Sequence, residues 1–466
     1  MSSVELSKFL RPLCTLLFGM AVLLFFGLAY PHHLHYQEQY QLFLFDSTYI
    51  WDIVKQPGGI ADLLGRFCTQ FFLFAWVGAL IIALLLVAVQ LLMLHLVKWG
   101  TAYGLSFVPS FLLWLFLLDE NALMGGVWAV LLTLLAIWLI ICLPKGWTRR
   151  IVIVVAIPTL YWVALGGIHY YRYPTIFPVL LYAAWFSAII IPLVLWYVIK
   201  RSKKNSVAEY SLSSFHISLS SFLLISVIMG TLVWKNSNFK AEEVMQYDFM
   251  ARHQQWNRIL ETINTKKPNN QIGVTVQNLA LAMHGLLVDH LFEYRQNGIA
   301  GLLPDVERDA TSPLATAEAF YQLGMISVAQ RTVFEAQEAI LDFQKSGRCY
   351  KRLAQTNLIN GNYEVSRKYL LALKKTLFYR EWADETLKLL GNEEAIAKHP
   401  EYGHLRQLAY TEDFYFGDHV TPEMLENLFL KNTENRLAYQ YLVAYYMLTN
   451  DRESYARLVQ YLSTKQ

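Results

Sequence analysis

The chain has 466 residues, of which 55% are hydrophobic and 16% are charged, and its mean hydropathy is +0.30. This composition is too apolar for a single soluble domain. The net charge of +3 is unevenly distributed: the first 234 residues hold 13 lysines and arginines against 8 acidic residues, and the rest hold 26 against 28. The basic excess therefore belongs to the apolar half, which excludes a basic nucleic-acid-binding surface.

We predict an all-α chain that begins with a transmembrane domain over residues 1–234. A membrane-spanning helix needs about 20 apolar residues to cross roughly 30 Å of hydrocarbon. The first apolar run lacks a small-x-small cleavage site, so we expect an uncleaved span and not a signal peptide. Seven runs are candidate spans: Leu13–Tyr30, Cys68–Val97, Thr101–Leu118, Val127–Leu143, Ile151–Leu165, Phe177–Ile199 and Phe215–Trp234.

The positions of lysine and arginine predict the orientation of these seven spans. Lysine and arginine are retained on the cytoplasmic side of a membrane. With seven alternating spans, ten basic residues fall on one side, including the cluster Lys200, Arg201, Lys203 and Lys204, and three fall on the other. We therefore expect a cytoplasmic N-terminus and an extracytoplasmic domain over residues 235–466.

The apolar runs contain few polar side chains that could carry transport. Gln90, His95 and His216 are the main ones, and no Asp, Glu, Lys or Arg lies near the middle of a run. An ion-coupled transporter keeps such charges at mid-membrane. The pattern therefore disfavours a transporter.

The first outer loop, residues 31–67, predicts two amphipathic helices separated by the turn Pro57-Gly58-Gly59. One interpretation is a collar that lies in the headgroup layer of the lipid bilayer. Three neighbouring histidines, His32, His33 and His35, would point in different directions on a helix. We therefore expect no metal site here, and no motif indicates a cofactor.

The second interpretation gives this loop a catalytic function. The layout of residues 1–234 resembles the GT-C type of membrane glycosyltransferase, which uses a lipid-linked sugar donor and carries an acidic residue in a long first outer loop. The loop contains no Asp-x-Asp pair. The resemblance implies catalytic roles for Glu38, Asp46 and Asp52, and substrate binding by Arg66, His169 and Arg172. His169 and Arg172 lie in the third outer loop, where aromatic anchoring at the interface is the alternative reading.

Residues 235–466 carry helical periodicity throughout. The stretch from Tyr350 through Leu353, Ala354 and Gly361 to Leu373 resembles a tetratricopeptide repeat, with weaker copies around Gly324 and Tyr439. The resemblance implies stacked helix pairs with a concave surface that binds a partner protein. An ordinary helical bundle is the alternative. No hydrolase motif such as HExxH or GxSxG occurs.

The whole chain also resembles an uncharacterised family of bacterial inner-membrane proteins. The shared segments are Glu38-Gln39, Pro57-Gly58-Gly59 with Arg66 and Gln70, Leu358-Ile359-Asn360-Gly361 and Thr376-Leu377-Phe378-Tyr379-Arg380. This resemblance implies a bacterial inner membrane and no particular activity. We therefore expect a membrane-anchored interaction or scaffold protein of the cell envelope. The alternative is a glycosyl or related group transferase.

Overall fold

The computed structural model describes residues 3–96, 100–165, 176–201, 212–304, 312–340, 344–410 and 421–465. Every regular element in these ranges is a helix. The β-type pairing within these ranges is an isolated bridge between Asn297 and Ile299. The all-α class predicted from the sequence is therefore confirmed. The chain divides into two compact units, Met1–Phe239 and Lys240–Gln466.

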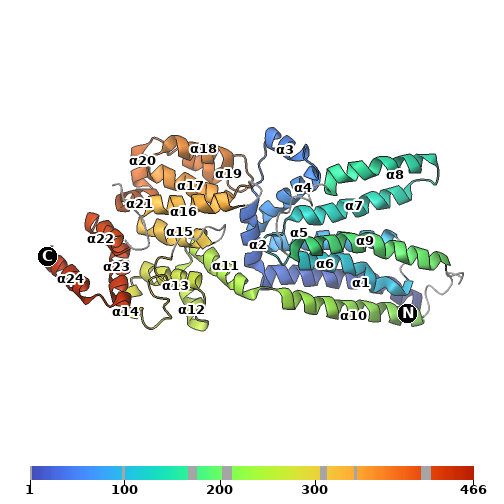
Figure 1. Cartoon of the computed structure of the whole chain (residues 1–466), viewed down its shortest axis with the longest axis horizontal. Helices are drawn as coiled ribbons and strands as arrows, with labels where there is room; N and C mark the ends of the chain where they lie inside the picture. Colours follow the sequence, from blue (N-terminus) through green and yellow to red (C-terminus); the bar gives the residue numbers. More distant parts are fainter. Residues whose placement is uncertain are drawn as a thin grey trace. The chain divides into compact units, whose positions relative to one another are not determined.

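The first unit is built from long apolar helices joined by short helical turns (Figure 1). Two of those turns, η1 and η5, are π-helical, and η2, η3 and η4 are 3₁₀-helical. Its elements are α1 Ser3–Leu24, η1 Phe25–Ala29, α2 Pro31–Gln37, η2 Glu38–Tyr40, α3 Ser47–Val54, α4 Gly59–Thr69, η3 Gln70–Leu73, α5 Ala75–Leu96, η4 Gly100–Phe107, α6 Val108–Phe116, α7 Met124–Cys142, α8 Trp147–Leu160, η5 Tyr161–Leu165, α9 Ile176–Arg201 and α10 Leu212–Asn236.

Six helical segments in the described part of the chain are long and apolar enough to cross a membrane. They are Phe9–Ala29, Ala75–Leu96, Met124–Cys142, Trp147–Ala164, Val179–Val198 and His216–Asn236. These helices have the number, length and composition of a multi-pass membrane protein. Each corresponds to one of the predicted runs.

Two predicted runs differ from the helices observed. The second was predicted to begin at Cys68, but Cys68 belongs to α4, and the extended backbone of Phe74 separates η3 from α5. The third run, predicted over Thr101–Leu118, forms a shorter apolar helix, Ala102–Phe116. Its first half is the 3₁₀ helix η4, and Pro109 lies in the first turn of α6, where a proline is tolerated.

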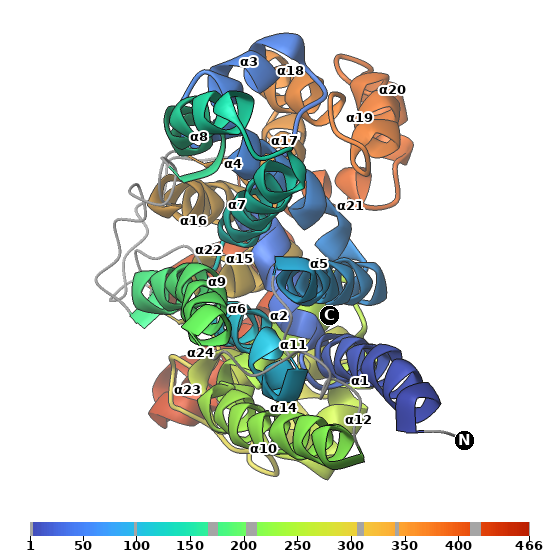
Figure 2. The same ribbon diagram turned by 90° about the vertical axis from the view of Figure 1, so that its right-hand side faces the viewer.

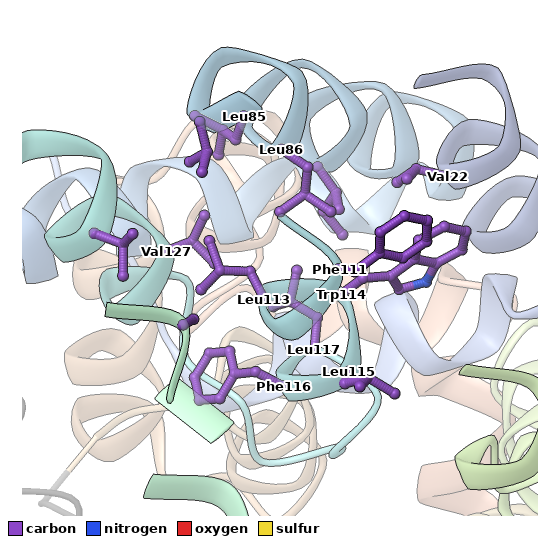
Figure 3. Close-up of a cluster of buried hydrophobic side chains, with 14 of the residues drawn as sticks. Val22, Leu85, Leu86, Phe111, Leu113, Trp114, Leu115, Phe116, Leu117 and Val127 are labelled. Carbon is purple, nitrogen blue, oxygen red and sulfur yellow. The ribbon is translucent and has the colours of Figure 1, made fainter. Parts of the chain in front are cut away.

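The helix α6 occupies the centre of the first unit. It packs against α5, α9 and α10, and the end-on view shows it between these helices and α1 (Figure 2). Phe111 and Trp114 stack with ring centroids 5.9 Å apart, and Phe18 of α1 meets both edge-on. Apolar side chains of α1, α5, α6 and α7 converge around this helix (Figure 3). The helix that is too short to be counted as a span is thus the most enclosed one.

Hydrogen bonds at the two ends of the first unit establish the directions of its helices. At one end, the Tyr103 hydroxyl donates to the Arg11 carbonyl at 3.0 Å, and the Gly104 N–H donates to Ser221 Oγ at 3.2 Å. At the other end, the Asn238 N–H donates to the Tyr30 hydroxyl at 3.0 Å. The helices α1 and α10 therefore run in the same direction. We call the end marked by Tyr30 and Asn238 the Tyr30 end.

A buried polar contact joins three helices inside this apolar unit. Gln90 of α5 is fully buried, accepts a hydrogen bond from Thr15 Oγ1 at 3.0 Å and donates to Ser106 Oγ at 3.3 Å. Its carboxamide is therefore satisfied by α1 and η4. The hydrogen bonds of Gln90 therefore give it a structural role, in which it links α5 to α1 and η4.

Two glycines allow α4 and α7 to approach each other closely. A Cβ atom on Gly65 would lie 2.3 Å from the backbone nitrogen of Gly125. Such a distance is shorter than any van der Waals contact. This crossing therefore requires a residue without a side chain at position 65, whereas a Cβ atom on Gly125 would lie 3.2 Å from the Asp62 Cα.

The second unit consists of shorter amphipathic helices. They are α11 Phe239–Arg252, which begins one residue before the boundary, α12 Trp256–Thr265, α13 Gln271–Met283, α14 Leu287–His290, α15 Ser312–Leu323, α16 Ile326–Ala339, α17 Gly347–Ile359, α18 Tyr363–Leu373, α19 Arg380–Leu387, α20 Glu393–Lys398, α21 Tyr402–Leu408, α22 Thr421–Lys431, α23 Arg436–Thr449 and α24 Arg452–Lys465.

Two tight helix pairs stack in this unit, α15 with α16 and α17 with α18, and α16 packs on α17 (Figure 1). Each pair turns at a glycine with a left-handed backbone, Gly324 at φ +89° and Gly361 at φ +79°. A side chain is disfavoured in this conformation, so glycine ends the first helix of each pair.

Candidate functional site

The segment after the first span covers the Tyr30 end of the first unit. His33 Nε2 donates to the Leu117 carbonyl at 2.9 Å, and Gln37 Nε2 donates to the carbonyls of Asp119 and Ala122, each at 3.3 Å. Both side chains are buried. The segment is therefore attached to the turn between α6 and α7.

Glu38 is the most buried of the predicted catalytic residues, with 5% of its surface exposed. It lies in η2, which packs against η3. Buried carboxamide and hydroxyl groups surround this packing, and the Thr69 hydroxyl donates to Gln41 Oε1 at 3.4 Å. The buried polar residues here are Gln37, Glu38, Gln39, Gln41, Thr69 and Gln70, which we call the polar layer.

Asp46 and Asp52 make local structural contacts. Asp46 caps the N-terminus of α3, because its Oδ1 accepts the Tyr49 N–H at 3.1 Å. Asp52 is exposed and pairs with Lys55, the residue that follows α3, at 2.5 Å. The structure therefore gives Asp46 a capping role and Asp52 a surface ion pair.

Arg66 is held by Asp62 of its own helix, α4, and by Tyr49 of α3. Its Nη2 lies 2.7 Å from Asp62 Oδ2, and its Nη1 lies 3.5 Å from the Tyr49 hydroxyl, which itself donates to the Leu42 carbonyl. Burial lowers the pKa of the guanidinium, but the nearby Asp62 and Tyr49 outweigh it and hold the pKa above its usual value. Arg66 stays charged and links α4 to α3.

The other two predicted binding residues, His169 and Arg172, lie outside the described residues. Within the described ranges, no group of three or more His, Cys, Asp or Glu side chains could hold a metal ion.

Sequence reasoning missed two carboxylates at the Tyr30 end. Asp119 and Glu120 lie in the turn to which Gln37 is bound, and burial raises the pKa of both. Their signal was available, because they are the acidic residues between the third and fourth apolar runs. They lie on the same turn that anchors the segment containing Glu38.

In the second unit, two ion pairs lie between α11, α15 and α17. Arg348 binds Asp248 through both terminal nitrogens, at 2.6 and 2.8 Å. Arg352 binds Glu318 at 2.6 Å, and its guanidinium carbon lies 3.6 Å from the centre of the Tyr321 ring. These side chains are mostly buried and paired within the chain.

A groove of about 510 Å³ lies on a different surface, between α16, α17 and α18. Five neutral polar side chains line it: Ser327, Gln330, Asn357, Asn360 and Asn362. Gln330 accepts a hydrogen bond from Asn360 Nδ2 at 3.3 Å and donates to Asn357 Oδ1 at 3.5 Å. These are long hydrogen bonds, so they can be exchanged for others.

The rest of the groove lining is apolar, with one positive charge. Phe334 and Val365 are half exposed, Leu353 is buried, and Tyr369 packs against the same apolar cluster as Leu353. Arg331 also lines the groove and pairs with Glu335 through Nε at 2.9 Å. The groove therefore offers hydrogen-bonding groups, an apolar surface and a cation.

A family model described as a family of unknown function (DUF6057) matches residues 7–466, which is nearly the whole chain. The chain belongs to DUF6057. No match was found among curated proteins or among solved structures.

In the described part of this DUF6057 member, the polar layer and the groove are the two candidate sites, because the ion pairs of Arg348 and Arg352 are already satisfied within the chain. The polar layer of its first unit contains Glu38 and is enclosed. The groove of its second unit is open and lined by three helices. An enclosed carboxylate suits acid–base chemistry or packing, whereas an open amphipathic groove suits binding.

Proposed function

We propose that this DUF6057 protein is a membrane-anchored interaction protein whose second unit binds a partner protein outside the cytoplasmic membrane. The open groove between α16, α17 and α18 is the observation that carries the proposal. It combines exposed apolar side chains with hydrogen-bonding groups, and such patches are typical of interaction sites.

We further propose seven membrane crossings, with Ala102–Phe116 as the third. The parallel directions of α1 and α10 support an odd number. The η4–α6 segment has the required reach, because it begins beside Arg11 and ends at Leu117, which binds His33. A 3₁₀ helix rises about 2.0 Å per residue, so η4 and α6 together extend about 30 Å.

In this arrangement the first unit spans the inner membrane of a bacterium. The N-terminus is then cytoplasmic and the second unit is extracytoplasmic. The distribution of lysine and arginine supports this orientation. The glycine-turned pairs α15–α16 and α17–α18 support a tetratricopeptide-like arrangement of the second unit.

The interaction function is tested with the full chain in its native membrane. A photo-reactive amino acid is introduced at exposed apolar positions on separate surfaces of the second unit, such as Phe292, Val365 and Leu430. We expect illumination to give one discrete protein adduct from at least one position. Absence of an adduct from every position, together with full function after deletion of residues 240–466, would exclude the interaction function.

The second candidate function is a group transferase that uses a lipid-linked sugar. The burial of Glu38 in the polar layer favours it, because a carboxylate shielded from water can act as a general base. Glu38→Gln should then abolish function with unchanged membrane abundance. The control is Asp52→Asn, since Asp52 is exposed and paired with Lys55. Full function of Glu38→Gln would exclude this carboxylate as the base.

A further inference from the structure

Building on the proposed interaction function, we propose that the groove binds an extended peptide segment of the partner that carries a large apolar side chain next to a carboxylate. The groove residues on α16 run from Ser327 to Phe334. Seven helical steps extend about 10 Å, which is the length of about three residues of an extended chain.

The carboxamides of the groove match the backbone of such a segment. An extended peptide presents alternating N–H and C=O groups, and each carboxamide carries both a donor and an acceptor. Gln330 already bridges Asn357 and Asn360 through bonds of 3.3 and 3.5 Å. Asn362 is exposed at the start of α18. Asn357 is buried and its Nδ2 donates to the Leu353 carbonyl at 2.7 Å. A bound backbone would therefore replace the long bonds of Gln330 and contact the exposed carboxamides of Asn360 and Asn362.

The apolar side chain of the segment would lie on Phe334 and Val365. These residues are 50% and 45% exposed, although both line a concavity. Leu353 and Tyr369 close its floor. Covering this surface removes apolar area from water, which favours binding.

The positive charge of Arg331 is the reason that we expect a carboxylate in the bound peptide. Arg331 lines the groove, whereas its partner Glu335 does not, and no Asp or Glu is among the described lining residues. Glu335 engages Nε of Arg331, so the terminal nitrogens are available to a carboxylate from the partner.

The other arginine-containing region of the second unit, around Arg348 and Arg352, is a less suitable site for this peptide. Its guanidinium groups already bind Asp248 and Glu318 within the chain, at 2.6 Å. A ligand carboxylate there would have to displace a buried partner, which leaves a charge uncompensated.

The test uses the full chain in lipid nanodiscs and a phage library of random heptapeptides, with empty nanodiscs for counter-selection. We expect enriched peptides to carry an acidic residue within three positions of an aromatic or aliphatic one.

An enriched peptide is then labelled, and its affinity for the full chain is measured by fluorescence anisotropy. Phe334→Ser should weaken binding at least about tenfold. Arg331→Gln should weaken it severalfold and reduce its salt dependence.

Matched controls are Leu371→Ser, because Leu371 is 49% exposed on α18 and does not line the groove, and Arg367→Gln for the charge. Both should bind within twofold of the natural chain. Lack of enrichment, or equal binding to Phe334→Ser, would overturn the peptide site. A photo-adduct that persists in that case would leave the interaction function intact and move it to another surface.

Discussion

The two terminal nitrogens of Arg348 each hold one oxygen of Asp248, at 2.6 and 2.8 Å, and thereby tie α17 to α11 across 100 residues of chain. Burial raises the pKa of Asp248, but Arg348, with Arg252 and His253 nearby, outweighs it and holds the pKa below its usual value. The carboxylate is therefore charged at neutral pH.

We expect removal of one partner of this ion pair to cost more than removal of both. Arg348→Met leaves Asp248 charged and enclosed, with an expected loss of about 3–5 kcal/mol. The double variant Arg348→Met with Asp248→Leu should recover most of that loss. Thermal unfolding of the three proteins in detergent measures the difference. A double variant less stable than Arg348→Met would contradict this account of the pair.

Substitution of Gly65 should disrupt the first unit. Gly65→Ala places a methyl group 2.3 Å from the backbone of Gly125, and backbone atoms of two packed helices cannot both move away cheaply. We expect a lower unfolding temperature and a smaller yield of monodisperse protein. Gly230→Ala on α10 is the control, because nothing lies within 4 Å of its Cβ position. Equal behaviour of the two variants would show that this crossing tolerates separation.

Stability should depend on pH through His33. Burial lowers the pKa of His33 to about 4, against the weaker opposing effect of its hydrogen bond to Leu117. Between about pH 6.5 and 4 the unfolded chain binds a proton that the folded chain does not, so stability falls as the pH falls.

His33→Gln keeps a donor for the Leu117 carbonyl but does not titrate. Its unfolding temperature should therefore fall less than that of the natural chain between pH 7 and pH 5. Parallel curves for the two proteins would assign the pH dependence to other groups.

Replacing Gln90 should have a small effect. Gln90→Met removes the hydrogen bonds to Thr15 and Ser106 but preserves volume, so we expect a loss of about 1 kcal/mol, typical of polar contacts between membrane helices. Function should persist in a complementation assay. Complete loss of function at normal abundance would assign Gln90 a chemical role.

The number of crossings can be measured directly. With seven crossings, a reporter fused after Gln466 is active only outside the cytoplasm. A second reporter inserted at Gly146, in the exposed connection between α7 and α8, should be active only inside. A cytosolic signal after Gln466 would favour six crossings and require a new assignment of the partner's compartment.

Apolar length and periodicity predicted much of the fold, including the helical class and six long helices. The third run forms a shorter α-helix than its apolar length predicts, because its first half is the 3₁₀ helix η4. Cys68 was assigned to the second span since apolar composition continues without a break through α4, η3 and α5. Only the backbone at Phe74 reveals where one helix ends and the next begins.

The candidate sites were harder to predict, because residue type does not reveal what a side chain contacts. Asp46 and Glu38 are acidic residues of the same loop, yet one caps a helix and the other is enclosed. The groove is formed by residues from three helices, and carboxamides such as Asn357 and Asn360 carry no motif. Such a surface becomes visible only when the helix packing is known.

The contact between Tyr30 and Asn238 has a consequence for biogenesis. These residues lie 208 positions apart, so the last long apolar helix closes against the first. While the ribosome is still making the intervening chain, the side of α1 that faces α10 has no permanent neighbour. Nascent chains that stop before Leu212 should therefore remain with the insertion machinery or be degraded, and stable assembly should begin only when α10 arrives.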